Sequence, residues 1–195
     1  FCSGSANSCA AWMLKDILPG PGSSAPFPVA SWGMNFMFYA TTLQHGAELW
    51  MSNSKPEQTT MVVDLDHSDG DSRPDHPNFL QDATGGYFIG TDGKWYLWRF
   101  DYASGEVRRL APAPEATSDM ALLGEQLLLA MPGEGIGNEL FRYSPGSDRL
   151  ELIKDIYPGD ESSSPQQFFV WNGRLYFQAT TPEAGAELWV SDGTP

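Results

Sequence analysis

The chain has 195 residues and a net charge of −14, and it contains seven Trp, eleven Phe and seven Tyr. A surface this acidic repels phosphate backbones and anionic lipid headgroups, so we expect no nucleic-acid partner. No stretch approaches the roughly 20 apolar residues of a membrane span, so we expect no direct membrane insertion. The length suits one domain with a sizeable core, and the 20 Gly and 15 Pro suit short strands joined by tight turns.

The first residues of the chain hold its two cysteines, Cys2 and Cys9, which enclose a loop of small and polar residues. A loop this short and flexible can close into a disulfide, which predicts an oxidising compartment. The alternative is two free thiols in a frayed terminus. The chain begins at Phe1 rather than Met, which suggests a mature form after removal of a targeting segment, although a trimmed chain would begin in the same way. We therefore expect an extracytoplasmic location, which is secreted, cell-surface or within an organelle lumen.

The first predicted strand, residues 12–17, is an apolar run that stands ahead of a series of repeated units. Each unit is predicted to form short strands around Gly turns, and Asn172-Gly173 between two apolar runs favours a two-residue hairpin. Many of these runs, such as residues 127–129 and 168–171, are apolar at consecutive positions. This pattern is typical of strands that are buried on both faces. The units span approximately residues 27–65, 77–111, 118–156 and 166–193.

A three-residue phrase recurs in the third predicted strand of each unit. Its four occurrences are Glu48-Leu49-Trp50, Tyr96-Leu97-Trp98, Glu139-Leu140-Phe141 and Glu187-Leu188-Trp189. The last positions of the phrase are 48, 43 and 48 residues apart. A period of about 40–50 residues with short strands is typical of the blades of a β-propeller.

The last unit ends before a fourth strand can form, whereas residues 12–17 stand alone and resemble the fourth strand of the third unit. Closing the ring would protect the open strand edges. We therefore predict an all-β fold: a single four-bladed β-propeller domain over residues 1–195, with four strands per blade. In this prediction residues 12–17 complete the last blade. The alternative is a fragment of a larger ring.

The last unit resembles a known repeat. Residues 185–194 are similar to the ELWxSDGT repeat of hyalin-like secreted and surface proteins of bacteria and protists. Residues 152–159, followed by 162–165, are similar to the linking phrase of that family, and residues 14–20, followed by 23–26, repeat it. The resemblance implies a propeller and an extracytoplasmic setting, and it implies no established activity.

The loop at residues 64–76 contains five carboxylates and two imidazoles. The first interpretation is a solvated surface loop that replaces the linking phrase. A second is a calcium site, because calcium needs six to eight oxygen ligands. A third is a transition-metal site at His67 and His76. We predict no other cofactor. The candidate calcium ligands are Asp64, Asp66, Asp69 and Asp71.

The other polar motifs favour structure over chemistry. Glu48, Glu139 and Glu187 could line a central axis as ligands, but Tyr96 interrupts the series, so we predict a structural position. His45 is predicted to be a surface residue, and residues 191–193 a turn. No nucleophile motif of the form G-x-S-x-G is present.

With no catalytic set in the sequence, we predict a non-enzymatic protein-interaction or scaffold module. It would be an accessory subunit of a larger extracytoplasmic or organelle-lumenal assembly, bound to another protein. Trp32 or Trp95 could serve as contacts, but burial is the favoured interpretation for each. One alternative is a lectin-like propeller that binds a glycan. Another is a hydrolase that uses acidic residues of the channel or of one face. A cation-dependent structural protein is a further alternative.

Overall fold

The computed structural model describes residues 11–67, 70–72 and 79–195. These residues form four antiparallel sheets in chain order, joined by turns and one short 3-10 helix, η1 (Pro56–Gln58). Sheet 1 contains β1 (Phe27–Trp32), β2 (Asn35–Thr42), β3 (Gly46–Ser52) and β4 (Thr60–Val63). Sheet 2 contains β5 (Phe79–Gln81), β6 (Gly85–Thr91), β7 (Trp95–Asp101) and β8 (Val107–Pro112). Sheet 3 contains β9 (Asp119–Leu123), β10 (Gln126–Gly133), β11 (Ile136–Ser144) and β12 (Arg149–Lys154). Sheet 4 contains β13 (Gln166–Trp171), β14 (Arg174–Thr181) and β15 (Gly185–Ser191).

The repeated phrase lies in the third strand of every sheet, as its spacing predicts. Glu48 lies in β3, Tyr96 in β7, Glu139 in β11 and Glu187 in β15. The predicted two-residue hairpin is also present, because Trp171 pairs with Arg174 across the turn. Its two central residues, Asn172 and Gly173, both have positive φ, at 48° and 71°. That backbone matches the twist of the flanking strands.

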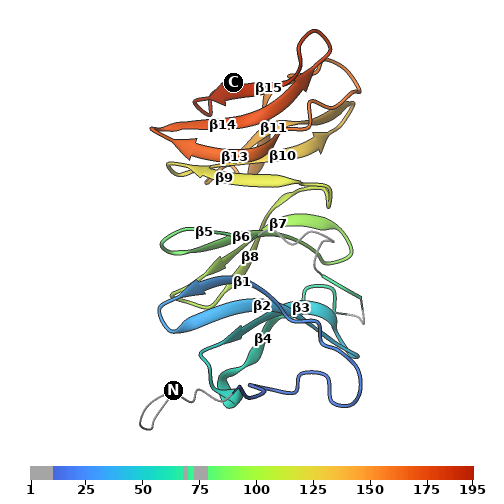
Figure 1. The fold of residues 1–195 in the computed structure, drawn as a ribbon, viewed down its shortest axis with the longest axis vertical. Helices are drawn as coiled ribbons and strands as arrows, with labels where there is room; N and C mark the ends of the chain where they lie inside the picture. The colour runs from blue at the N-terminus through green and yellow to red at the C-terminus, as the bar shows by residue number, and fades with distance from the viewer. Residues whose placement is uncertain (1–10, 68–69, 73–78) are drawn as a thin grey trace.

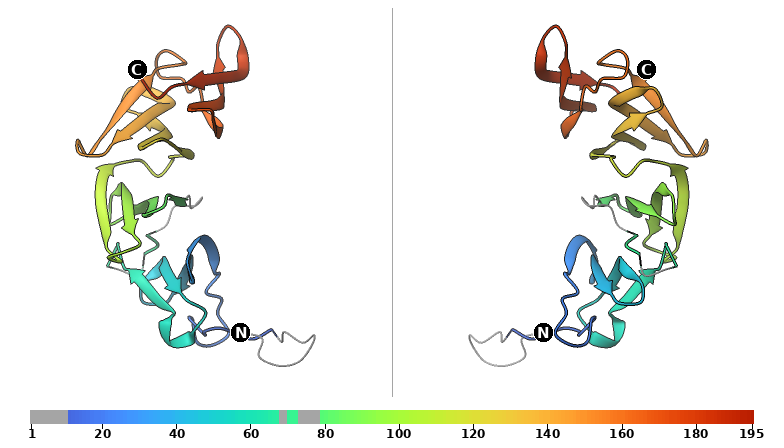
Figure 2. Two further views of the ribbon diagram at one scale, coloured as in Figure 1. Left: turned by 90° about the vertical axis from the view of Figure 1, so that its left-hand side faces the viewer. Right: turned by 90° about the vertical axis from the view of Figure 1, so that its right-hand side faces the viewer.

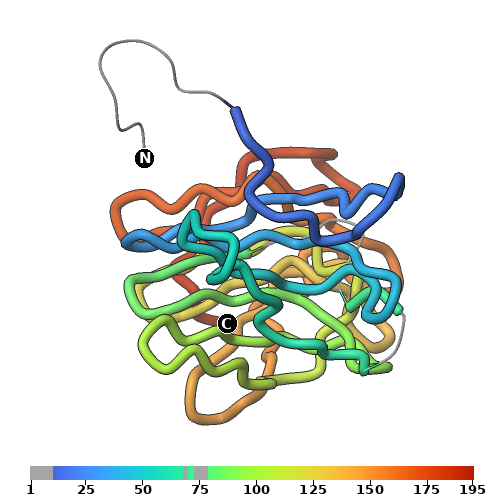
Figure 3. Tube along the Cα trace, turned by 90° about the horizontal axis from the view of Figure 1, so that it is seen from below, coloured from blue at the N-terminus to red at the C-terminus, as the bar shows by residue number. Residues whose placement is uncertain are grey.

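The four sheets stack face to face from the N-terminal to the C-terminal end (Figure 1). The view along the stack shows the sheets lying one behind another (Figure 3). Three apolar clusters fill the spaces between successive sheets. Consecutive residues of one strand serve opposite clusters: Leu127 and Leu129 of β10 face sheet 2, whereas Leu128 faces sheet 4. This double burial explains the continuous apolar runs of the sequence.

The stack bends into an open arc, and its two ends do not meet (Figure 2). Residues 12–17, predicted to complete the last blade, form no strand and lie against sheet 1. Ile17 packs against Phe38 and Trp50, and Lys15 Nζ donates a hydrogen bond to the Thr59 carbonyl at 2.6 Å. The prediction was wrong because the open edge of β15 lies at the far end of the arc, beyond the reach of a segment held on sheet 1.

Two leucines at the same repeat position test the assignment of the sheet faces. Leu49 is 1% exposed between sheets 1 and 2, whereas Leu188 is 77% exposed on sheet 4. We expect Leu49→Ala to lower the free energy of unfolding by about 2–5 kcal/mol, because it leaves a cavity. Leu188→Ala at low protein concentration should change it by no more than about 0.5 kcal/mol. Urea unfolding measures both, and equal losses would contradict the assigned faces.

Candidate functional site

Two of the repeated glutamates are buried at the joints between sheets. Glu139 is fully buried, and its carboxylate accepts three hydrogen bonds from the segment that leads into sheet 4. Its Oε1 accepts from the Ser163 backbone N–H at 2.8 Å. Its Oε2 accepts from the Ile156 N–H at 2.8 Å and from the Ser163 hydroxyl at 2.7 Å. Because the linker supplies all three donors, the carboxylate fixes the path of the chain from sheet 3 to sheet 4.

Glu48 makes the same connection between sheets 1 and 2. Its Oε2 accepts hydrogen bonds from the Ser72 hydroxyl and from the Leu65 N–H. Its Oε1 has no partner among the described residues. Burial raises the pKa of Glu48 to about 7, hydrogen bonds from Ser72 and Leu65 oppose the rise, and the nearby Asp64 carboxylate adds to it.

In both joints the serine also contacts the sheet that follows. The Ser72 carbonyl accepts from the Thr91 N–H at 3.0 Å, and the Ser163 carbonyl accepts from the Thr180 N–H at 2.8 Å. We call this arrangement the glutamate–serine clasp: a glutamate of the third strand, a serine of the linker and the second strand of the next sheet. It joins neighbouring sheets by hydrogen bonds that are independent of their apolar contacts.

The joint between sheets 2 and 3 has no clasp, because Tyr96 replaces the glutamate. The Arg109 guanidinium lies 4.6 Å from the centre of the Tyr96 ring. The linker is held instead by the Ala113 N–H, which donates to the Trp95 carbonyl at 3.2 Å. Glu48 and Glu139 thus occupy separate joints, in agreement with the predicted structural position, whereas Glu187 is exposed on sheet 4.

Sequence reasoning missed the serine partners, although a signal was present. Ser72 and Ser163 each follow their glutamate by 24 residues, and each precedes a proline by two positions. Trp32 packs inward, as the favoured interpretation expects, with its ring stacked on Tyr102 at a centroid distance of 4.2 Å.

The acidic loop is described only in part, since residues 68–69 and 73–78 lie outside the described residues, and with them Asp69 and His76. Asp64 accepts from the His67 N–H at 2.9 Å and lies 2.7 Å from Nδ1 of the half-exposed His45. Asp71 accepts from the Ala47 N–H at 2.7 Å. Within the described ranges no three His, Cys, Asp or Glu side chains gather as a metal site. The calcium site, with Asp66 and Asp69 as further ligands, stays a prediction.

The disulfide between Cys2 and Cys9 also stays a prediction, because residues 1–10 lie outside the described part of the chain. No helix among the described residues is long and apolar enough to cross a membrane.

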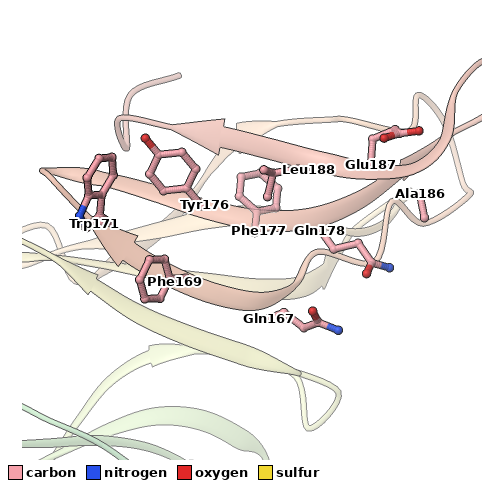
Figure 4. A pocket seen from close by; sticks show the side chains of 9 residues that line it. All are labelled: Gln167, Phe169, Trp171, Tyr176, Phe177, Gln178, Ala186, Glu187 and Leu188. Atoms are coloured by element: carbon pink, nitrogen blue, oxygen red, sulfur yellow. The ribbon is translucent and has the colours of Figure 1, made fainter.

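The outer face of sheet 4 carries an apolar groove of about 490 Å³ (Figure 4). Phe169, Trp171 and Leu188 are 62%, 59% and 77% exposed, and the half-buried Tyr176 lies among them. Polar side chains border the groove: Gln167, Gln178 and Glu187. In sheet 1 the face at the same repeat positions is buried against sheet 2, where Met37 is 0% and Leu49 1% exposed. The groove is therefore the face that would receive a further sheet.

Comparisons with known proteins identify the fold. No protein-family model and no curated protein matches the sequence. TolB from Acinetobacter baumannii is similar in structure with a TM-score of 0.55 at 18% identity, over 88% of this chain and 42% of TolB. A prolyl endopeptidase structure matches with a TM-score of 0.60 at 14% identity, over 87% of this chain and 27% of that chain. A putative TolB from Agrobacterium tumefaciens matches with a TM-score of 0.51 at 12% identity, over 84% of this chain and 60% of that chain.

At these identities the likeness shows the fold alone, an all-β arrangement of the TolB-like propeller type. The chain spans less than two thirds of the length of each of these structures.

The buried Glu48 makes stability depend on pH. Its pKa is about 7 when folded and 4.5 ordinarily, so between these values the folded state binds more protons than the unfolded state. The free energy of unfolding should therefore fall by about 3 kcal/mol as pH rises from 4.5 to 7, and then level off. Glu48→Gln should remove this decline, whereas the exposed control Glu183→Gln should keep it. Urea unfolding between pH 4 and 8 measures the effect, and an unchanged slope in Glu48→Gln would contradict the assignment.

Proposed function

We propose that the chain is a protein-interaction module whose contact surface is the outer face of sheet 4. The supporting observation is the groove itself. Exposed large apolar side chains gather there, Phe169, Trp171 and Leu188, and the exposed Val190 lies two residues further along β15. Contiguous apolar patches of this kind mark sites of association, and aromatic residues are enriched at the cores of interfaces.

The sequence adds the setting of this module. The resemblance of residues 185–194 to the ELWxSDGT repeat supports an extracytoplasmic location and a place as an accessory subunit of a larger assembly. The net charge of −14 favours a protein partner over nucleic acid. The similarity to peptidase structures carries the fold alone, so it supports no hydrolase.

Glycan binding is the second candidate, favoured by the composition of the same groove. Trp171 and Tyr176 offer aromatic faces 6.1 Å apart, and Gln167, Gln178 and Glu187 offer polar groups beside them. Aromatic rings with adjacent amides and carboxylates can contact the apolar face and the hydroxyls of a sugar.

The protein-binding function predicts where a partner contacts the chain. A photo-crosslinking amino acid at position 188 should capture another polypeptide chain in an extract of the producing cells, because that side chain is at the centre of the exposed face. The same group at position 183, in the turn of the same hairpin, should capture about tenfold less. Capture measured by mass spectrometry that is equal at both positions, or absent from both, would contradict the proposal.

The glycan candidate predicts a different outcome. If the groove binds a sugar, the purified chain should bind members of a glycan array, and Trp171→Ala should weaken that binding at least tenfold through loss of the stacking surface. Trp32→Phe, which keeps the ring contact with sheet 2, is the control. An array without binding would remove this candidate and leave the protein-binding function in place.

A further inference from the structure

The two ends of the arc carry the two halves of one glutamate–serine clasp. The donor half lies at the N-terminal end. Residues 14–26 match residues 153–165, and Ser24 falls at the position of Ser163. The Ser24 carbonyl accepts from the Thr41 N–H at 2.9 Å, just as the Ser163 carbonyl accepts from the Thr180 N–H at 2.8 Å. The next residue has positive φ in both segments, 43° at Ala25 and 48° at Ser164. Ser24 therefore has the backbone geometry of a clasp serine.

The acceptor half lies at the C-terminal end. Glu187 pairs with Ala179 across sheet 4, as Glu48 pairs with Ala40 across sheet 1. The sequence Gly-Ala-Glu-Leu-Trp surrounds both glutamates, at residues 46–50 and 185–189. Glu48 is fully buried by the linker that follows its sheet, whereas Glu187 is exposed and contacts no donor among the described residues. The N-terminal end thus has a clasp serine without a glutamate, and the C-terminal end has a clasp glutamate without a serine.

The apolar surfaces beside the two half-clasps are open as well. Leu188 and Val190 are 77% and 48% exposed at the C-terminal end. Met13 and Phe27 are 73% and 49% exposed at the N-terminal end. The ends lie apart in the open arc, and residues 14–26 are held on sheet 1, so the chain does not satisfy its own Glu187 (Figure 2).

We propose that a second copy of this chain occupies the groove, head to tail, and completes the clasp. The Ser24 hydroxyl of one copy donates to the Glu187 carboxylate of the other, and sheet 1 of that copy covers Leu188 and Val190. This rests on the proposed function and names its partner. Because the contact joins two different surfaces, it is heterologous and builds a closed ring or an open chain of copies. The charge of −14 on each copy opposes the contact, so association strengthens as salt screens that repulsion.

Sedimentation of the purified 195-residue chain over a range of concentrations tests the association. We expect oligomers whose fraction rises with protein concentration and with ionic strength. Leu188→Asp should abolish them, and Glu187→Gln should weaken the association about tenfold, because a charge-assisted hydrogen bond becomes a neutral one. Glu183→Gln, four residues away in the same hairpin, should leave it unchanged. A chain that stays monomeric at every concentration and salt overturns the proposal.

Disulfide trapping tests the geometry. Two differently tagged copies, both with Cys2→Ser and Cys9→Ser, carry Ser24→Cys in one and Glu187→Cys in the other. The mixture should form a cross-linked pair, whereas Ser24→Cys with Glu183→Cys should not. Cross-linking within a single monomeric copy that carries both cysteines would overturn the proposal in favour of closure by the chain's own N-terminal segment. Capture of a different protein at position 188, with a purified chain that stays monomeric, would also overturn it while leaving the proposed function intact.

Discussion

The structure depends on apolar contact between the facing sides of successive sheets. Strands such as β10, with Leu127 and Leu129 on one face and Leu128 on the other, cannot be stable beside solvent on either side. The fold solves this by stacking, because each sheet covers one face of the next. An open array of four sheets has two outer faces. On sheet 1, Ile17 packs against Phe38 and Trp50, whereas no described segment covers the outer face of sheet 4, where Trp171 and Leu188 are exposed.

Apolar contact is non-directional, so it does not fix the path of the linker between two sheets. The glutamate–serine clasp fixes that path at two of the joints. The carboxylate of Glu139 accepts its three hydrogen bonds from the linker, so it positions the linker rather than adding apolar contact to the core. The cost is an ionisable group at a buried joint, which appears in the raised pKa of Glu48. At the joint that has Tyr96 in place of the glutamate, Arg109 lies over the Tyr96 ring within sheet 2 and no clasp is present. The clasp is therefore a device of some joints and not a requirement of the fold.

The sequence predicts what is local and periodic. The spacing of the repeated phrase placed it in the third strand of each sheet, and Asn172-Gly173 marked a two-residue turn. The destination of residues 12–17 could not be predicted, because their phrase matches both a fourth strand and the linker after it, and because local sequence does not set the curvature of an arc. The serine partners of Glu48 and Glu139 could have been predicted from their shared separation of 24 residues. The exposed groove could not have been predicted, since its residues are of the same types as the buried residues at the same repeat positions in other sheets.

Identical residues of this chain are buried in one sheet and exposed in another. Residues 46–50 and 185–189 have the same sequence, yet Leu49 is 1% exposed and Leu188 is 77% exposed. Residue type is identical at the two places, so the difference comes entirely from the presence of a following sheet. A face that is exposed because no described sheet covers it needs no special residue types, so comparison of sequence motifs cannot identify it. It is recognised by comparing the burial of residues at the same repeat position. Glu48 and Leu49 are buried by the linker and sheet that follow them, whereas Glu187 and Leu188 are both exposed.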